Sequence, residues 1–285
     1  MLKIFFVFVF LINTLYSKNI NLGYDMNALG QFSKKDLKIA TDVWITKLFT
    51  NLDYTGRFYY YNDTKKMSFD IENAKLDFVS MNPLNLIKHF DLSKLEPSFS
   101  EGAKDVNDLY LVVLINAKSN INSYKDFKNK KIILDLNEPV SKMCIDYYYL
   151  KANGDLNINY ENSTSSQNSI LKLFFNKADV TIVRYKNYKL SIELNPQIAK
   201  KVLVFEKTKL RNTQMGMYRK SLNIALKEMI THQSSILNQS VDGRQILDIY
   251  KIEKIEQTNM QDLANIKKFY EKFRKLKEEK DKGSN

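Results

Sequence analysis

The residues best suited to ligand chemistry follow an apolar run in the middle of the chain. The stretch ILDLNEPVSKMCIDYYYL, residues 133–150, predicts a buried strand, a short loop at Glu138 and Pro139, and a helix that starts near Ser141. A helix N-terminus placed after a strand is a common anion site, because backbone N–H groups and the helix dipole point at the ligand. The glycines of a phosphate-binding loop are missing. The stretch is therefore either a ligand site or an ordinary strand-to-helix connection.

Three side chains of this connection have alternative roles. Ser141 either caps the helix or donates its hydroxyl to a ligand, and Glu138 either binds a cationic group or lies in solvent near the positive helix end. Cys144 can bind a soft metal or metalloid, whereas a lone cysteine in a helix is more often a small buried residue. It is the only cysteine, so no intrachain disulfide forms and an apolar core must hold the fold.

A second group of polar residues stands at the ends of predicted strands. Arg184 ends the apolar run VTIV and suits bidentate contact with a carboxylate or phosphate, or else a salt bridge at the edge of the lobe. Ser80 and Asn82 end another strand beside a helix N-terminus, where the Asn-Pro pair also fits a turn. The remaining candidates are Tyr24 and Asp25 at the end of the first strand, and Tyr185, which either walls a cleft or serves in packing.

No sequence pattern of an enzyme or of a metal centre is present. The chain has no HExxH, P-loop, GxSxG or CxxC motif, and no nucleophile has a base beside it in the sequence. His89 and His232 are far apart and have no partners at the spacing of metal ligands. We therefore expect a binding protein that uses no cofactor and no metal, rather than an enzyme.

Hydrophobic periodicity places these residues on two α/β units. A βαβαβα pattern runs from KNINLGYD to NPLNLIKHF, which predicts a parallel sheet with helices on its faces. The segment LEPSFSEGAKDVND is expected to be a loop, and a second βαβαβ pattern runs from YLVVLIN to ADVTIVRY. We expect a first lobe over residues 18–112, a second lobe over 113–208, and a return to the first lobe with C-terminal helices over 209–285. The helical tail from Met260 should pack on the first lobe.

The first residues are typical of an export signal. Lys3 precedes the apolar run IFFVFVFLI, and the small residue Ser17 stands before Lys18, which predicts a secretory signal peptide over residues 1–17. The apolar run is short for a bilayer span of about 20 residues; a retained anchor is the alternative. The net charge of +12 fits an anionic ligand or surface, but it is spread along the chain, and we expect no nucleic-acid partner for an exported protein.

The order of several segments resembles a known family. SYKDFKNKKIILDL resembles the start of the second lobe in type 2 periplasmic solute-binding proteins, and LKLFFNKADVTIVRY resembles a later element that carries a ligand-facing residue. KLDFVSMNPLNLIKHF is similar to a first-lobe element of the phosphate, phosphite and phosphonate branch, and GRQILDIYKIEKI resembles its C-terminal return. The resemblance covers most of the chain after residue 17. It implies two α/β lobes, joined by crossover strands that act as a hinge, which close on a ligand.

The chain departs from that branch at the ligand. The resemblance implies a Ser-Thr-Ser or Ser-Gly run at the start of the second-lobe helix, where hydroxyls grip oxyanion oxygens. Here the positions read NEPVSKM, so only Ser141 keeps a hydroxyl and Glu138 adds a negative charge. Arg184 stands where the family often has an acid. The resemblance therefore carries over the fold but not the phosphonate ligand.

These observations lead to three hypotheses about function. The first is a monomeric periplasmic solute-binding protein that captures a small polar or anionic ligand by lobe closure and delivers it to an inner-membrane ABC permease. The second is the same clamp presenting its ligand-bound form to a membrane sensor histidine kinase. The third is an exported enzyme or an adhesive surface protein.

Overall fold

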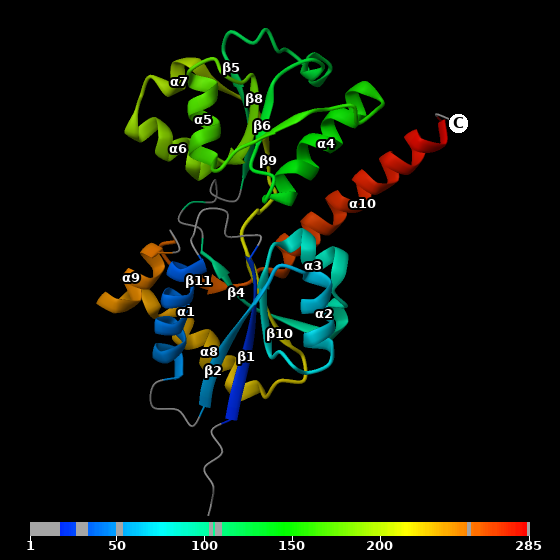
Figure 1. The fold of residues 1–285 in the computed structure, drawn as a ribbon. Helices are drawn as coiled ribbons and strands as arrows, with labels where there is room; N and C mark the ends of the chain where they lie inside the picture. Colours follow the sequence, from blue (N-terminus) through cyan, green and yellow to red (C-terminus); the bar gives the residue numbers. More distant parts are fainter. Residues whose placement is uncertain are drawn as a thin grey trace, which may run out of the picture.

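The computed structural model describes residues 18–26, 34–49, 54–102, 105, 110–249 and 252–283. Within them, helices and strands form two α/β lobes, which lie one above the other in Figure 1. The two-lobe α/β fold expected from the sequence is confirmed. Residues 1–17 lie outside the described residues, so the signal peptide stays a prediction.

The first lobe contains a mixed six-stranded sheet with the order β11-β4-β10-β3-β1-β2. As the βαβ pattern predicts, β1 is parallel to β2 and β3, whereas β10 is antiparallel to β3 and β4, and β11 is antiparallel to β4. In chain order the strands are β1 (Lys18–Asp25), β2 (Tyr54–Tyr61), β3 (Phe78–Met81), β4 (Leu95–Glu101), β10 (Met215–Arg219) and β11 (Ile255–Gln257).

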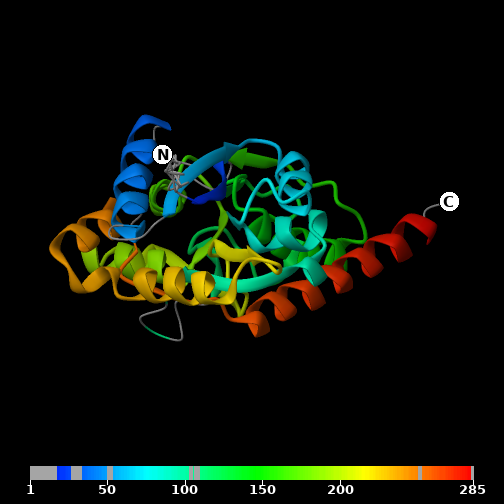
Figure 2. The same cartoon turned by 90° about the horizontal axis from the view of Figure 1, so that it is seen from below.

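Helices cover both faces of this sheet (Figure 2). One apolar cluster joins the sheet to α1 (Lys34–Phe49), α8 (Ile224–Ser235) and α9 (Val241–Ile249). The other joins it to α2 (Thr64–Glu72) and α3 (Pro83–His89). Asn82 caps α3, and Pro83 takes the first helical position, where its missing N–H costs nothing.

The second lobe contains a five-stranded sheet with the order β7-β6-β8-β5-β9. Its strands are β5 (Leu111–Asn116), β6 (Ile132–Leu134), β7 (Tyr160–Asn162), β8 (Val180–Arg184) and β9 (Val202–Thr208). Its helices are α4 (Pro139–Asn153) on one face, and α5 (Ser166–Phe174), α6 (Tyr185–Leu194) and α7 (Ile198–Lys201) on the other. Gly154 ends α4 at a φ of 84°, as the Asn-Gly pair predicts.

The chain crosses between the lobes twice, after β4 and again between β9 and β10. The expected boundary at residue 112 falls inside β5, and this strand pairs along its whole length with β8 and β9, so Leu111 and Val112 belong to the second sheet. Residues 95–101, expected as a loop, form β4. Their Pro and Ser content disfavours a strand locally, but pairing with β10 and β11 on either side satisfies the backbone.

The C-terminal helix α10 (Met260–Gly283) contacts both lobes, where the sequence predicted packing on the first lobe alone. Leu263 lies in an apolar cluster of the first lobe, whereas Phe269 stacks edge-to-face on Tyr147 of α4, with 4.8 Å between ring centroids. Figure 1 shows the helix running past α3 and α4 and ending beyond the body of the protein. None of the described helices is long and apolar enough to cross a bilayer.

Candidate functional site

A cavity of about 870 Å³ lies between the two lobes. The first lobe lines it with residues at the ends of β1, β3 and β4 and with side chains from α9 to β11; the second lobe lines it with the start of α4, α5 and α6. Residues 212–214, between β9 and β10, also line it. The cavity therefore sits where open α/β sheets bind ligands, outside the carboxyl ends of the strands.

Three of the predicted residues reach the cavity from the first lobe. Tyr24 and Ser80 stand at the ends of the neighbouring parallel strands β1 and β3, and Asn82 follows β3. The Ser80 hydroxyl donates to the Gln214 side-chain oxygen at 2.9 Å. Burial raises the pKa of Tyr24, so its phenol stays neutral. This wall offers hydroxyl and amide groups to a ligand.

A polar chain links the two lobes at the start of α4. Asn82 donates to the side-chain oxygen of Asn212 at 3.1 Å, and the Asn212 amide donates to Glu138 at 3.0 Å and to the Ser141 hydroxyl at 3.1 Å. Ser141 in turn donates to the Glu138 carboxylate at 3.0 Å. Burial raises the pKa of Glu138, while the nearby positive charge of Arg184 acts in the opposite direction.

The helix that carries Glu138 begins earlier than the sequence predicts. Pro139 is its first residue and Glu138 its N-cap residue, although the Glu138 side chain makes no capping bond. Ser141 is therefore the third helical residue and does not cap the helix. Its side chain is buried and holds the Glu138 carboxylate, and it is not among the residues lining the cavity.

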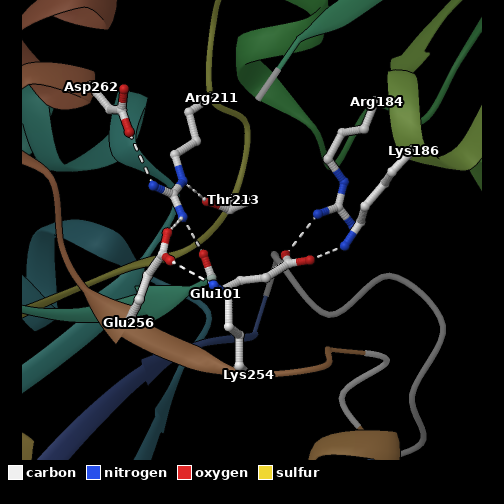
Figure 3. A network of polar contacts seen from close by, with 8 residues as sticks. All are labelled: Glu101, Arg184, Lys186, Arg211, Thr213, Lys254, Glu256 and Asp262. Atoms are coloured by element: carbon white, nitrogen blue, oxygen red, sulfur yellow. Dashed lines mark hydrogen bonds and ion pairs between the residues drawn. The ribbon is translucent and has the colours of Figure 1, made fainter. Parts of the chain in front are cut away.

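Arg184 lines the cavity but is held by an acid of the other lobe. Its guanidinium donates to Glu101, at the end of β4, at 2.7 Å, and Lys186 of α6 pairs with the other oxygen of the same carboxylate. Figure 3 shows Glu101 between these two second-lobe cations and the cluster around Arg211. Arg184 thus forms a salt bridge, which joins the two lobes, and its role toward a ligand stays a prediction.

Arg211 anchors the crossing between β9 and β10 to the first lobe (Figure 3). Its side chain is 3% exposed and pairs with Asp262 of α10 and Glu256 of β11, both at 3.0 Å. It also donates to the Thr213 hydroxyl and to the backbone carbonyl of Glu101. Arg211, in the segment that crosses between the lobes, and Glu101, which bridges the lobes through Arg184, therefore belong to one polar network.

Three further predicted residues, like Ser141, lie away from the lining of the cavity. Asp25 is buried and accepts a hydrogen bond from Asn85 at 3.2 Å. Tyr185 packs in the second lobe, with the Lys207 ammonium 4.2 Å from its ring centroid. Cys144 lies fully buried in the second-lobe core, and burial raises the pKa of its thiol to about 12, so a soft-ligand role has no support from its position.

Sequence reasoning missed several residues that line the cavity. Asn212 and Gln214 belong to a crossing segment with no motif, and Glu101 and Ser100 belong to a strand that was expected as a loop. Asp135 follows β6 directly, and a polar residue that comes straight after a buried strand could have been predicted from the sequence. Within the described ranges, no group of three His, Cys, Asp or Glu side chains could hold a metal ion.

Comparison with known proteins places this architecture in a family. The family model described as "ABC transporter, phosphonate, periplasmic substrate-binding protein" matches residues 27–263. No curated protein matches the chain in sequence. Among solved structures, PhnD1 from Prochlorococcus marinus in complex with methylphosphonate has a TM-score of 0.63 at 14% identity, with 91% of this chain and 99% of that chain covered.

Two further structures share the fold at similarly low identity. XAC2383 from Xanthomonas citri bound to ATP has a TM-score of 0.64 at 10% identity, covering 92% of this chain and 99% of that chain. A binding-protein component of an ABC phosphonate transporter from Pseudomonas aeruginosa has a TM-score of 0.57 at 15% identity, covering 94% and 100%. On the family match and the fold together, the chain belongs to the phosphonate family of periplasmic substrate-binding proteins of ABC transporters.

Proposed function

We propose that this protein captures a small polar organic solute in the cavity between its lobes and delivers it to an inner-membrane ABC permease. The observation that carries the proposal is the cavity itself, which takes its lining from both lobes and from the segment that crosses between them. A ligand there is buried only when the lobes come together, so binding and closure are coupled. The closed, loaded form is then the one the permease receives.

The proposed contacts come from both walls. Tyr24, Ser80 and Asn82 offer hydroxyl and amide groups from the first lobe, and Glu138 faces them from the second. Ser141 and Asn212 position the Glu138 carboxylate rather than contact the ligand. Arg184 contributes positive charge to the cavity while bridging the lobes through Glu101.

The relatives support capture and delivery. PhnD1 was solved with methylphosphonate, and XAC2383 with ATP in one structure and chloride in another, so the shared fold accommodates anionic ligands in those proteins. The relatives give no support to the sensor-kinase alternative. We propose a periplasmic monomer without enzymatic activity, exported by the signal peptide expected over residues 1–17.

The test is a thermal-shift screen followed by small-angle scattering. The panel contains phosphate, phosphonates, sulfonates, carboxylates, amino acids and amines. A true ligand at 100 times its dissociation constant should add about 2.7 kcal/mol to the free energy of unfolding and reduce the radius of gyration. Asn82→Ala should weaken the effect, because it removes both a lining amide and the link to Asn212.

The matched control is Glu228→Gln, at an exposed position of α8 far in sequence from every lining residue of the second lobe. It should leave ligand binding unchanged. The proposal fails if a ligand stabilises Asn82→Ala as strongly as the parent, or if a stabilising ligand leaves the scattering profile of the protein unaltered. It also fails if no member of the panel binds.

A further inference from the structure

The charge around the cavity is opposite to the charge of the protein as a whole. The chain carries +12 at pH 7, yet the described residues that line the cavity include six carboxylates and four basic side chains. The carboxylates are Glu101, Asp105, Asp135, Glu138, Glu193 and Glu253, and the basic side chains are Arg184, Lys186, Lys189 and Lys254. A cavity with this balance attracts cations, because low-dielectric walls strengthen the local field.

The basic side chains of the lining are already engaged by protein carboxylates. Arg184 and Lys186 both pair with Glu101, and Lys189 lies 3.9 Å from the Asp105 carboxylate. Lys254 pairs with Glu256 at 3.5 Å. An anionic ligand that used Arg184 and Lys186 would have to displace Glu101 and open the bridge between the lobes.

Asp135 and Glu138, by contrast, are held by neutral donors. Asp135 accepts from the Asn137 backbone N–H at 3.0 Å, and Glu138 accepts from Ser141 and Asn212. No basic side chain within the described ranges forms an ion pair with either. Burial raises the pKa of both carboxyls; at Glu138 the positive charge of Arg184 opposes this rise, and the charge of Asp135 adds to it. A positive charge placed between them would relieve this cost.

A separate observation shows that the same cavity is built for a polar ligand. Ser100, at the end of β4, is 4% exposed, and its hydroxyl has no hydrogen-bond partner within the described part of the chain. The Gln214 side-chain nitrogen is likewise buried and makes no hydrogen bond of standard geometry there, although the Gln214 side chain lies close to the Tyr24 phenol. Both residues line the cavity. Because leaving a buried polar group unsatisfied is costly, a ligand that hydrogen-bonds to both side chains removes that cost.

From this arrangement we infer that the natural ligand carries a cationic group, a protonated amine or a guanidinium, which lies against Asp135 and Glu138. The inference rests on the proposed function and specifies its substrate class. Glu101 is the residue that sets this preference, because its carboxylate already pairs with the two cations that would otherwise receive a phosphonate. Ser100 and Gln214 would bind the uncharged polar part of the same ligand. A simple dianion would meet Glu138 at the start of α4 and be repelled.

The test uses pairs of probes that differ by one amine. Isothermal titration compares 2-aminoethylphosphonate with ethylphosphonate, and 2-aminoethanesulfonate with ethanesulfonate, with choline and agmatine as cations that lack an acid group. We expect the amine-bearing member of at least one pair to bind tenfold or more tightly than its partner. Glu138→Gln should remove most of that preference, and Asp135→Asn provides a second variant if the first folds poorly. Glu228→Gln is the control that should keep the preference.

The inference is overturned if the two members of both pairs bind equally, if the anion without an amine binds more tightly, or if no amine-bearing probe binds. It is also overturned if Glu138→Gln and Asp135→Asn both fold and keep the full amine preference. Tight binding of ethylphosphonate with lobe closure would leave the proposed function standing while refuting the charge assignment. Failure of every probe in the wider thermal-shift panel would instead refute the proposed function.

Discussion

The bridge between Glu101 and the two second-lobe cations should control how firmly the lobes close. The side chains are only partly exposed, 12% for Glu101, 21% for Arg184 and 27% for Lys186. Each pair has a Coulomb attraction of about 4 kcal/mol at an effective dielectric constant of about 20. Desolvation and loss of side-chain freedom offset much of this. Exposed ion pairs contribute about 0.2–1 kcal/mol, and breaking a buried pair costs about 3–5 kcal/mol.

Glu101→Gln should therefore shift the equilibrium toward the open form by about 2 kcal/mol, a factor of about 30. The substitution keeps the shape of the side chain but leaves Arg184 and Lys186 without their shared counter-charge. Raising the salt concentration should shift the parent protein in the same direction, since partly exposed charges are screened. The effect should appear without ligand and reduce the affinity for any ligand that requires closure.

The distance between α6 and α9 reports this change. Spin labels at Leu194→Cys and Gln245→Cys, both exposed positions, measure it by pulsed electron resonance. Cys144 does not interfere, because it is fully buried. Glu101→Gln should broaden the distance distribution and move it to longer values.

The matched control is Glu96→Gln on the same strand. Glu96 pairs with Lys227 of α8 inside the first lobe, so its loss should affect stability but not the distance between the lobes. If the distance distribution of Glu101→Gln superimposes on that of the parent protein, the Glu101 bridge does not hold the lobes together. The same conclusion follows if Glu96→Gln changes the distance distribution as much as Glu101→Gln does.

Three further predictions concern the interior. The pKa of Glu138 is raised in the folded state, so the folded protein binds this proton more tightly than the unfolded chain does. The bound proton therefore stabilises the fold below the unfolded pKa of 4.5. This stabilisation is lost as the pH rises through the folded pKa. Glu138→Gln should flatten the stability profile above that value in urea titrations, and an unchanged slope would contradict the assignment. Arg211→Met should lower the free energy of unfolding by about 3–5 kcal/mol, because it leaves Asp262 buried without its partner. An unchanged denaturation midpoint would show that the Arg211–Asp262 pair does not stabilise the fold. Cys144 should react with a thiol reagent only on unfolding, since burial raises its pKa to about 12, and fast labelling of the native protein would show that α4 is loosely packed.

Local patterns in the sequence determined the elements and much of one wall of the site. The apolar runs that became β5, β6 and β8 are buried from end to end, and the polar residues that follow such runs reach the cavity because parallel strands end at one edge. Asn82 before Pro83 fixed a helix start, and Gly154 fixed a helix end. Each of these signals acts within a few residues, which is why a single sequence carries it.

Only the tertiary structure decided how these elements combine. β4 has the composition of a loop and is a strand because β10 and β11, more than a hundred residues away, pair with it. The contacts that define the cavity are of the same kind: Glu101 meets Arg184 across 83 residues of sequence, and Asn212 meets Glu138 across 74. Such pairs depend on the angle between two lobes, and no local propensity encodes that angle. The sequence by itself therefore determined that Glu138 stands at a helix start and Arg184 at a strand end. Their partners, and hence whether each charge is left for a ligand, depend on the packing of one lobe against the other.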